Sequence, residues 1–295
     1  MIKLAILGSE NSHAWGFSSV FAPKDGKKMF EDVELIGMHL NPETEDGKIA
    51  MEKIMERSTI TEFSSDPETF VADADAVMVT ARHGGDHLKF IRKYIEKGIP
   101  VWVDKPITAS VGEAEELVAL CKKHSAPVSG GSSLAHAKGV VKCAEYVKNN
   151  PGTVFGGHVT APVNMVNNYG NFWFYSQHLV QMITEIFGIE ARKVSAVKDE
   201  HGVRAQYFFD DYSVSAYFGS GYSVTLYAGG YEVVQENVVL EGEYYIPELE
   251  SFYKVIKTGK SDKDYRTLVA PVYIIDATIK AFETGKETEI IIPEL

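Results

Sequence analysis

The chain has 295 residues, which is enough for two ordinary domains. Hydrophobic residues make up 45% and charged residues 24%, a balance typical of folded globular proteins that excludes extensive disorder. The formal net charge of −12, without any Lys- or Arg-rich run, argues against a nucleic-acid partner or an anionic membrane surface.

Cysteine usage and hydropathy indicate the compartment. Cys121 and Cys143 are the only cysteines, and their spacing suggests neither a metal site nor a redox pair, which fits a reducing environment. No leader pattern precedes the first strand, and no apolar run approaches membrane length. We therefore expect a cytoplasmic protein.

The first elements are typical of a nucleotide-binding sheet. Residues 3–7 form an apolar strand that runs into Gly8, and a helical pattern follows. A dinucleotide-binding turn usually has three glycines, but Glu10 and His13 stand in the second and third positions. A carboxylate in the second position should hinder the approach of backbone to the pyrophosphate. Ser12 is able to cap the helix and leave backbone amides free for an anion.

The second strand, residues 33–38, ends without the expected acidic residue. That residue usually binds the adenosine ribose, and His39 stands in its place. Either His39 or Asn41 has the chemistry to hydrogen-bond the ribose, and His39 is also able to face a 2′-phosphate. No Arg or Lys is adjacent, so NAD and NADP both stay open. A helix over 43–56, a short strand over 60–63 and a turn of helix near Pro67 follow.

The fourth strand, residues 75–80, ends in a loop that contains Gly84 and Gly85. This loop is flexible enough to close on a ligand, and Asp86 is expected to cap the next helix. His87 lies on the apolar face of that helix, at the carboxyl end of a strand, which favours a role in the site. The alternative is a histidine that only satisfies hydrogen bonds in the helix's first turn.

Asp104, Lys105 and Pro106 follow a short apolar strand over 101–103. The charged pair therefore lies at the carboxyl end of a strand, where open α/β sheets bind their ligands. Pro106 restricts Lys105 to an extended backbone, and the bond between them is a candidate cis peptide. The alternative is an ordinary surface ion pair. A helix over 111–124, with Cys121 in its apolar stripe, and a strand over 127–133 complete a doubly wound parallel sheet in a domain of residues 1–133.

The second half of the chain has a different pattern. Helices are predicted over 137–149 and 172–187, with an alternating strand over 154–163 between them. Further strands are predicted over 193–197, 203–209, 213–218, 222–227 and 231–240, with hairpin turns at 210–211 and 219–221. Two helices over 246–258 and 268–284 and a strand over 289–292 end the chain. We predict a domain of residues 134–295 built on an open-faced, mainly antiparallel sheet.

The whole chain resembles the Gfo/Idh/MocA family of NAD(P)-dependent oxidoreductases. The resemblance rests on the order of elements, on Asp104-Lys105-Pro106, on His87 and His178, and on the last two helices, residues 250–260 and 279–286. It implies a Rossmann domain joined to an open-faced sheet domain and hydride transfer between a nicotinamide and a sugar-like or polyol carbon. It also implies that Lys105 binds the reacting hydroxyl and that His178 accepts its proton, without a metal.

The resemblance and the position of each residue together define the candidate contacts. The substrate contacts are Lys105, Tyr175, His178 and Gln181. The cofactor contacts, for NAD or NADP, are Gly8, Ser9, Asn11, Ser12, His13, His39, Asn41, Thr80, Ala81, His83, His87, Asp104 and Lys105.

The chain also departs from the family. The family commonly has an Asp four residues before the helix histidine and a Gly two before it, where this chain has Phe174 and Ser176. A carboxylate one turn away would orient the imidazole, and Phe174 has no group to do so. A solvated helix face is the alternative for His178, Gln181 and Glu185.

Two other functions are compatible with this fold. The first is a non-catalytic sensor that binds a dinucleotide or a sugar, which the departures favour and the retained Lys105 disfavours. The second is an enzyme of the same fold that uses bound NAD to hydrolyse glycosides. No residue of the sequence specifically supports this function. Because large exposed apolar surfaces usually mark interfaces, we expect the tyrosine-rich sheet to pack against another copy in a homodimer or homotetramer.

Overall fold

The computed structural model describes residues 1–240 and 244–295. The chain divides into two compact units. The first unit contains residues 1–108, 112–130 and 249–263, and the second contains residues 109–111, 131–248 and 264–295. This division differs from the predicted single boundary near residue 133, because a late segment returns to the first unit. No helix in the described ranges is long and apolar enough to cross a membrane.

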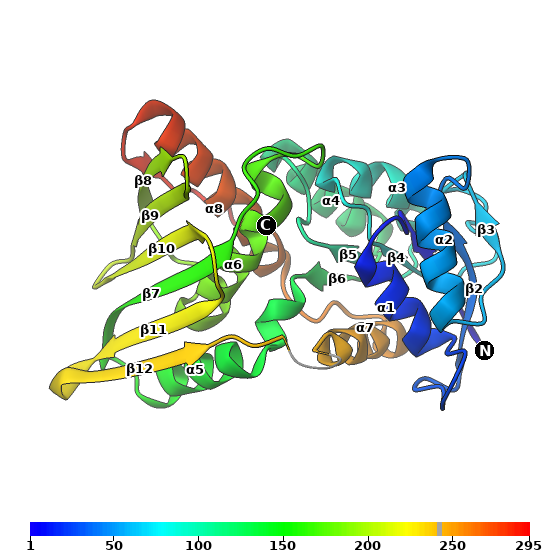
Figure 1. The fold of residues 1–295 in the computed structure, drawn as a ribbon, viewed down its shortest axis with the longest axis horizontal. Helices are drawn as coiled ribbons and strands as arrows, with labels where there is room; N and C mark the ends of the chain where they lie inside the picture. Colours follow the sequence, from blue (N-terminus) through cyan, green and yellow to red (C-terminus); the bar gives the residue numbers. More distant parts are fainter. Residues whose placement is uncertain (241–243) are drawn as a thin grey trace. The chain divides into compact units, whose positions relative to one another are not determined.

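The first unit is built on a six-stranded sheet in the order β3-β2-β1-β4-β5-β6 (Figure 1). Its strands are β1 (Ile2–Leu7), β2 (Val33–His39), β3 (Phe63–Ser64), β4 (Ala76–Val79), β5 (Val101–Asp104) and β6 (Val128–Gly131). Strands β1 to β5 pair in parallel, which confirms the predicted doubly wound sheet. The strand order reverses between β1 and β4, so ligands are expected at the carboxyl ends of these strands.

Five helices belong wholly or mainly to this unit. They are α1 (Ser12–Phe21), α2 (Glu45–Arg57), α3 (Gly84–Glu96), α4 (Val111–His124) and α7 (Ile246–Thr258). The central strands are buried on both faces, which explains why they read as continuous apolar runs. Cys121 on α4 is fully buried, as predicted. Helix α7 joins the first unit through Asp32, which accepts hydrogen bonds from Tyr253 Oη and Lys257 Nζ, both at 2.8 Å.

The second unit is built on a seven-stranded sheet in the order β12-β11-β7-β10-β9-β8-β13. Its strands are β7 (Val154–Pro162), β8 (Lys193–Asp199), β9 (Gly202–Phe208), β10 (Ser213–Gly219), β11 (Ser223–Ala228), β12 (Glu232–Asn237) and β13 (Thr288–Glu289). The sheet is mainly antiparallel, as predicted, but β7 and β10 run parallel. The helices are α5 (Lys138–Asn149), α6 (Phe172–Phe187) and α8 (Tyr265–Thr284), with short 3₁₀ turns η1 (Ser133–His136) and η2 (Gly229–Tyr231).

The predicted hairpin at 219–221 is wrong. Strands β10 and β11 are not neighbours, because β7 lies between them and pairs with both. Alternation of apolar residues identifies a strand but not its partner. A connection of three residues with Gly221 at φ +67° is long enough to cross one intervening strand, about 10 Å. The hairpin at 210–211 is confirmed by the antiparallel pairing of β9 with β10.

Helices α5, α6 and α8 cover one face of the second sheet, and no helix of the described residues covers the other face (Figure 1). The inward residues of the strands and the apolar stripe of α6 form the core of this unit. Smaller elements differ from prediction at their ends: β3 and β13 have only two residues each, and residues near Pro67 form turns and no helix. These segments are short, so sequence periodicity carries little information about them.

Candidate functional site

The turn after β1 is held against the ends of β4 and β2. Gly8 has φ +68°, and a Cβ there would lie 2.6 Å from the Cβ of Ala81, so only glycine fits this turn. Thr80 Oγ1 donates to the Gly8 carbonyl at 3.1 Å. On the other side, the backbone N–H of Ser9 donates to the carbonyl of His39 at 2.9 Å. Both neighbouring strands therefore fix the turn.

The start of α1 presents two unpaired backbone donors. Asn11 caps this helix, and the prediction of Ser12 as the cap is wrong: Asn11 Oδ1 accepts the N–H of His13 at 2.8 Å and of Ala14 at 3.3 Å. Asn and Ser are equally good caps, so adjacent candidates are not distinguished by type. Among the described residues, none accepts the N–H of Asn11 or Ser12. Two free donors at the positive end of a helix fit an anionic pyrophosphate.

Glu10, in the second glycine position, is fixed on the β2 side of the turn. Its Oε1 accepts the backbone N–H of Asn41 at 2.9 Å. The carboxylate therefore lies at the carboxyl end of β2, where a ribose is bound in dinucleotide-binding sheets. The predicted obstruction by this side chain is relieved by this contact, and the turn fits a dinucleotide.

His39 also faces the turn. It is 7% exposed, and its Nδ1 accepts the N–H of Gly8 at 3.0 Å. Burial lowers the pKa of His39, although the charge of Glu10 opposes the shift. The ring is therefore neutral at neutral pH and offers no positive charge to a 2′-phosphate, which removes the basis for that alternative.

His13, in the third glycine position of the turn, contacts the end of β5. His13 Nδ1 lies 2.7 Å from Asp104 Oδ2, and the backbone N–H of Lys105 donates to Asp104 Oδ1 at 2.7 Å. Burial alone would raise the pKa of Asp104, but the charge and hydrogen bond of His13, together with the charge of Lys105, hold it below its ordinary value. Asp104 is thus a carboxylate, and it lies beside a buried ammonium.

Lys105 is only 7% exposed, and burial lowers its pKa although Asp104 opposes the shift. The Lys105–Pro106 bond is cis, which settles the question that the sequence left open. A Cβ on Gly84 would lie 2.7 Å from Pro106 Cγ, so the loop after β4 packs against this turn. A surface ion pair, the alternative interpretation, is therefore wrong: the Asp104–Lys105 pair is buried.

The loop after β4 uses two histidines as structural groups. His83 caps α3 by accepting the N–H of Gly85 at 3.0 Å, so the predicted cap by Asp86 is wrong. His87 is fully buried, with Nε2 2.8 Å from the carbonyl of Ala81 and Nδ1 3.3 Å from that of Ile107. The hydrogen-bonded alternative for His87 thus agrees best with its surroundings.

We expect His87 to make the protein less stable in weak acid. Burial lowers the pKa of His87 below its ordinary 6.5, so the folded chain binds fewer protons than the unfolded chain. The free energy of unfolding should therefore fall as the pH drops below about 6.5, by up to about 1.4 kcal/mol per pH unit. Urea unfolding of the wild type and His87→Gln at several pH values between 5 and 8 tests this. His39 and His158 shift in the same direction, so the variant should have a smaller pH slope but not a flat profile. An unchanged slope would contradict the assignment.

In the second unit, His178 on α6 is held by a hydroxyl that sequence reasoning missed. Its Nδ1 lies 2.7 Å from Ser132 Oγ, and the imidazole is 8% exposed. The same Oγ accepts the N–H of Leu134 at 3.3 Å as the cap of η1. The sequence does show a Ser directly before a short helical turn, which is a signal for a cap. It does not show that this Ser contacts His178 on α6, 46 residues away.

Aromatic rings pack beside this histidine, and one of them stands where the family commonly has an Asp. Tyr175 packs edge-on against His178 with centroids 5.1 Å apart. Phe174, in place of the usual Asp, packs against Tyr169 at 5.0 Å and Tyr175 at 4.8 Å. A carboxylate is therefore replaced by apolar packing, and the orientation of His178 depends on Ser132.

Gln181 is mostly engaged within its own helix. It is 4% exposed, and it accepts from Gln177 at 3.4 Å and donates to Glu185 at 2.9 Å. A Cβ on Gly131, which has φ +119°, would lie 2.9 Å from Gln181 Oε1. This face of α6 therefore packs closely against the segment that carries Ser132, so the solvated-face alternative is wrong for His178 and Gln181.

The sequence of the first unit matches a known family. Residues 33–132 match the model of the Gfo/Idh/MocA oxidoreductase family, described as having an NAD-binding Rossmann fold. The matched range includes β2, the loop after β4 and Asp104-Lys105-Pro106. No curated protein sequence matches the chain.

Solved structures share the fold of nearly the whole chain. GenD2 from gentamicin A biosynthesis, in complex with NAD, is 15% identical with a TM-score of 0.80, covering 98% of this chain and 96% of that one. Myo-inositol dehydrogenase from Lactobacillus casei, with NAD(H) and myo-inositol, is 12% identical with a TM-score of 0.80, covering 100% and 98%. Scyllo-inositol dehydrogenase from Lactobacillus casei, with NAD(H) and scyllo-inositol, is 16% identical with a TM-score of 0.79, covering 98% and 99%.

The family match and the fold lead to the same conclusion. The matched residues contain the buried Asp104–Lys105 pair and the strand ends that border the dinucleotide turn. At these identities the solved structures establish the fold of the chain. Residues 33–132 match the Gfo/Idh/MocA family of oxidoreductases with an NAD-binding Rossmann fold, and nearly the whole chain shares the fold of the solved structures.

Proposed function

We propose that the protein is an NAD-dependent oxidoreductase that transfers a hydride between the nicotinamide and a CH–OH carbon of a sugar-like or polyol substrate. The observation that carries the proposal is the buried Asp104–Lys105 pair at the end of β5, inside the family-matched range. The inositols and NAD(H) in the two Lactobacillus casei structures of the same fold support the substrate class.

Lys105 supplies positive charge for the reacting oxygen. Its burial strengthens the interaction of the ammonium with an alkoxide, because little water competes for it. Asp104, fixed by His13, holds the backbone of Lys105 and keeps the charge of the pair balanced in the absence of substrate. NAD, when bound, accepts the hydride, and the free N–H groups of Asn11 and Ser12 would hold its pyrophosphate.

His178 is proposed as the group that takes the hydroxyl proton. When Nδ1–H donates to Ser132 Oγ, Nε2 is the unprotonated nitrogen of the neutral ring and therefore the one that would take the proton. With NAD bound, His178 would take the proton of the alcohol while the nicotinamide would supply the hydride acceptor, so that a ketone would result. Ser132 fixes the ring in this tautomer, a task that a carboxylate performs where the family's Asp is present.

Not every predicted contact remains in the proposal. The side chains of Ser9, Thr80 and His87 have no exposed surface, so we assign them to shaping the site and not to binding. The role of Gln181 as a substrate contact stays a prediction, as do the cofactor contacts at Asn41, Ala81 and His83.

A panel of inositols and hexoses incubated with NAD and the purified protein tests the proposed reaction. Formation of NADH with a single class of compounds, together with a stoichiometric ketone product, is the expected result. The sensor alternative is kept because Phe174 replaces the family's Asp and packs as an apolar group. Saturable ligand binding without any NADH formation across the panel would favour that alternative.

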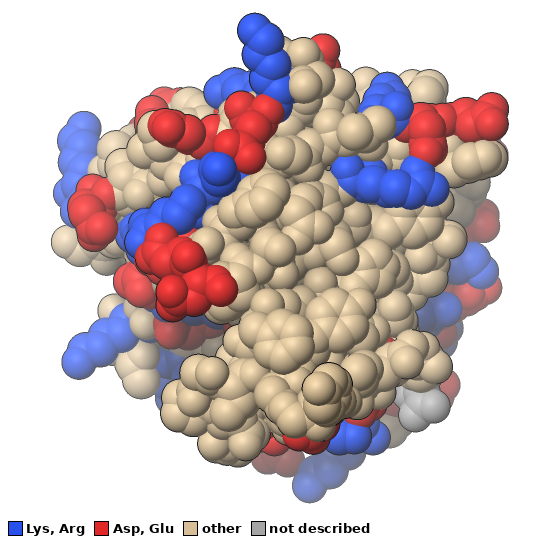
Figure 2. Space-filling model, turned by 90° about the vertical axis from the view of Figure 1, so that its left-hand side faces the viewer, with Lys and Arg blue, Asp and Glu red and all other residues tan. Residues whose placement is uncertain are grey.

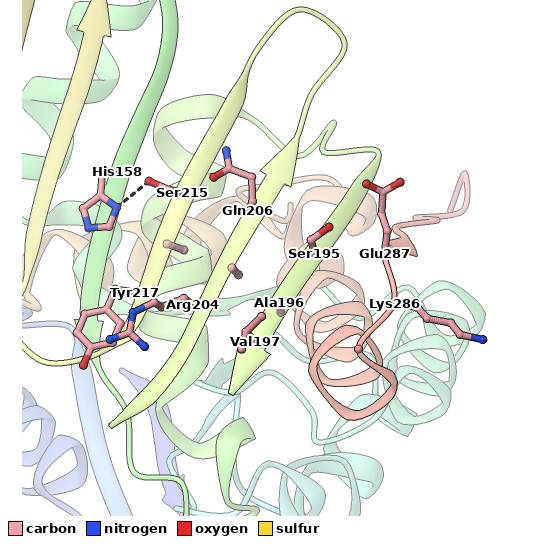
Figure 3. Close-up of a pocket in the computed structure, with 13 residues that line it drawn as sticks. His158, Ser195, Ala196, Val197, Arg204, Gln206, Ser215, Tyr217, Lys286 and Glu287 are labelled. Atoms are coloured by element: carbon pink, nitrogen blue, oxygen red, sulfur yellow. Dashed lines mark hydrogen bonds between the residues drawn. The ribbon is translucent and has the colours of Figure 1, made fainter. Parts of the chain in front are cut away.

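The open face of the second sheet supports the predicted homo-oligomer. Figure 2 shows a broad uncharged surface, with charged side chains gathered around its border. A hollow of about 600 Å³ on this face is lined by strands β7 to β10 (Figure 3), and His158 Nδ1 contacts Ser215 Oγ in it at 2.7 Å. Val197 and Val233 are 69% and 57% exposed on the strands of this sheet. Uncharged surfaces of this extent are typical of subunit interfaces.

We expect Val197→Lys to weaken the oligomer. Val197 lines the hollow on β8, so a charge there would lose its hydration in a sheet-to-sheet interface. Light scattering of the wild type should give two or four chain masses at micromolar concentration, and the variant should shift toward one. Met55→Lys is the control, because Met55 is 43% exposed on α2 in the first unit. A monomeric wild type would contradict the prediction.

A further inference from the structure

The ribose end of the candidate dinucleotide site lacks its usual carboxylate on β2. In doubly wound sheets an Asp or Glu at the end of the second strand accepts hydrogen bonds from the adenosine ribose hydroxyls. Here the last residue of β2 is His39, which is buried and already accepts the N–H of Gly8. The strand itself therefore offers no free acceptor side chain at this position.

A carboxylate reaches the same place from a different element. Glu10 belongs to the turn after β1, 31 residues before Asn41, and its Oε1 accepts the Asn41 N–H at 2.9 Å. Among the described residues, none makes a hydrogen bond or ion pair with the second carboxylate oxygen of Glu10. One oxygen thus fixes the side chain beside the end of β2, and the other is available to accept hydrogen bonds.

The charges around this position are mainly negative. Glu43 is exposed two residues after Asn41, and α2 begins with Glu45 and Asp46. Arg82, the cation that faces α2, is 3.4 Å from Asp46 and so is already paired. A ribose with two hydroxyls would find an acceptor here, whereas a 2′-phosphate would meet carboxylates.

We propose that Glu10, in the second glycine position of the turn, replaces the missing acidic residue of β2 as the ribose acceptor and selects NAD against NADP. The inference rests on the proposed function, because it assumes that a dinucleotide occupies the turn. The proposal assigns a function to Glu10, which the sequence alone indicated only as an obstruction in the glycine motif. Glu10 both closes the turn against β2 and provides the negative charge that rejects a 2′-phosphate.

Titration of the purified protein with NADH and NADPH, followed by nicotinamide fluorescence, tests the proposal without a substrate. The wild type should bind NADH at least about tenfold more tightly than NADPH, and Glu10→Gln should reduce that ratio about tenfold. The Gln carbonyl is able to keep the hydrogen bond from Asn41, so the turn is preserved, and thermal unfolding checks this. Glu43→Gln is the matched control, since it removes the same charge from an exposed position in the loop after β2, two residues from Asn41.

Three results of these titrations would overturn the proposal about Glu10. Equal or tighter NADPH binding by the wild type would overturn the proposal, and so would an unchanged ratio in Glu10→Gln. An equal loss of preference in Glu43→Gln would overturn it as well, because the effect would then come from the general charge of the loop. If the wild type bound neither nucleotide, the proposed function itself would fail and this inference would fail with it.

Discussion

Replacing Lys105 with Ala should lower turnover by about three orders of magnitude while NADH binding changes by less than about threefold. Lys105 is 7% exposed, so the interaction of its ammonium with a developing alkoxide is screened little by water. In the proposed function this charge acts on the substrate oxygen, and the proposed pyrophosphate contacts at Asn11 and Ser12 stay intact in the variant. Turnover with the best compound from the polyol panel and nicotinamide fluorescence, measured on the same preparation, separate the two effects.

Lys105→Arg is the informative companion variant. It keeps a positive charge but replaces a compact ammonium with a planar group that a site built for lysine does not accommodate. It should therefore recover little of the lost turnover. Wild-type turnover in Lys105→Ala would mean that the catalytic assignment is wrong, and lost NADH binding would mean that Lys105 holds the cofactor and not the substrate.

Replacing Gly130 with Ala should destabilise the first unit by about 3 kcal/mol or more. Gly130 on β6 has φ +146°, and a Cβ there would lie 2.0 Å from the carbonyl oxygen of Val103 on β5. The neighbour is backbone in a buried strand, so it cannot move aside without breaking the pairing that precedes Asp104. Urea unfolding measures the change.

Gly112→Ala is the matched control for Gly130→Ala. Gly112 lies in the first turns of α4, and nothing lies within 4 Å of a Cβ at that position. Alanine there should be neutral or stabilise the protein by up to about 1 kcal/mol, because it favours the helix. If Gly130→Ala were as stable as the wild type, the close approach of β6 to β5 would not exist as described.

Long periodic segments were predicted well from the sequence. Helices α4, α6 and α7 have the bounds that their apolar spacing indicates, and the buried strands β1 and β5 were found from short apolar runs. Asp104 and Lys105 were placed correctly at the end of β5 because an abrupt change from apolar to charged residues marks a strand end. Local patterns were sufficient for these features.

Features that depend on distant residues were not predicted. Strand β11 pairs with β7 and not with β10, its neighbour in sequence, because pairing is decided by the packing of the whole sheet. The contact of Ser132 with His178 joins residues 46 apart, and that of Glu10 with Asn41 joins residues 31 apart. From the sequence alone, Glu10 was expected to obstruct the turn. The position of its carboxylate depends on the hydrogen bond to Asn41, which the sequence does not reveal.

Titration of the wild-type protein with NADH, followed by fluorescence and by displacement with NAD, tests whether the turn after β1 holds a dinucleotide. We expect saturable binding of one NADH per chain, because Gly8 and the free N–H groups of Asn11 and Ser12 form a working pyrophosphate site without the other two glycines. Absence of saturable binding would rule out such a site. It would mean that Glu10 and His13 close the turn, and that the family's fold persists here without its cofactor.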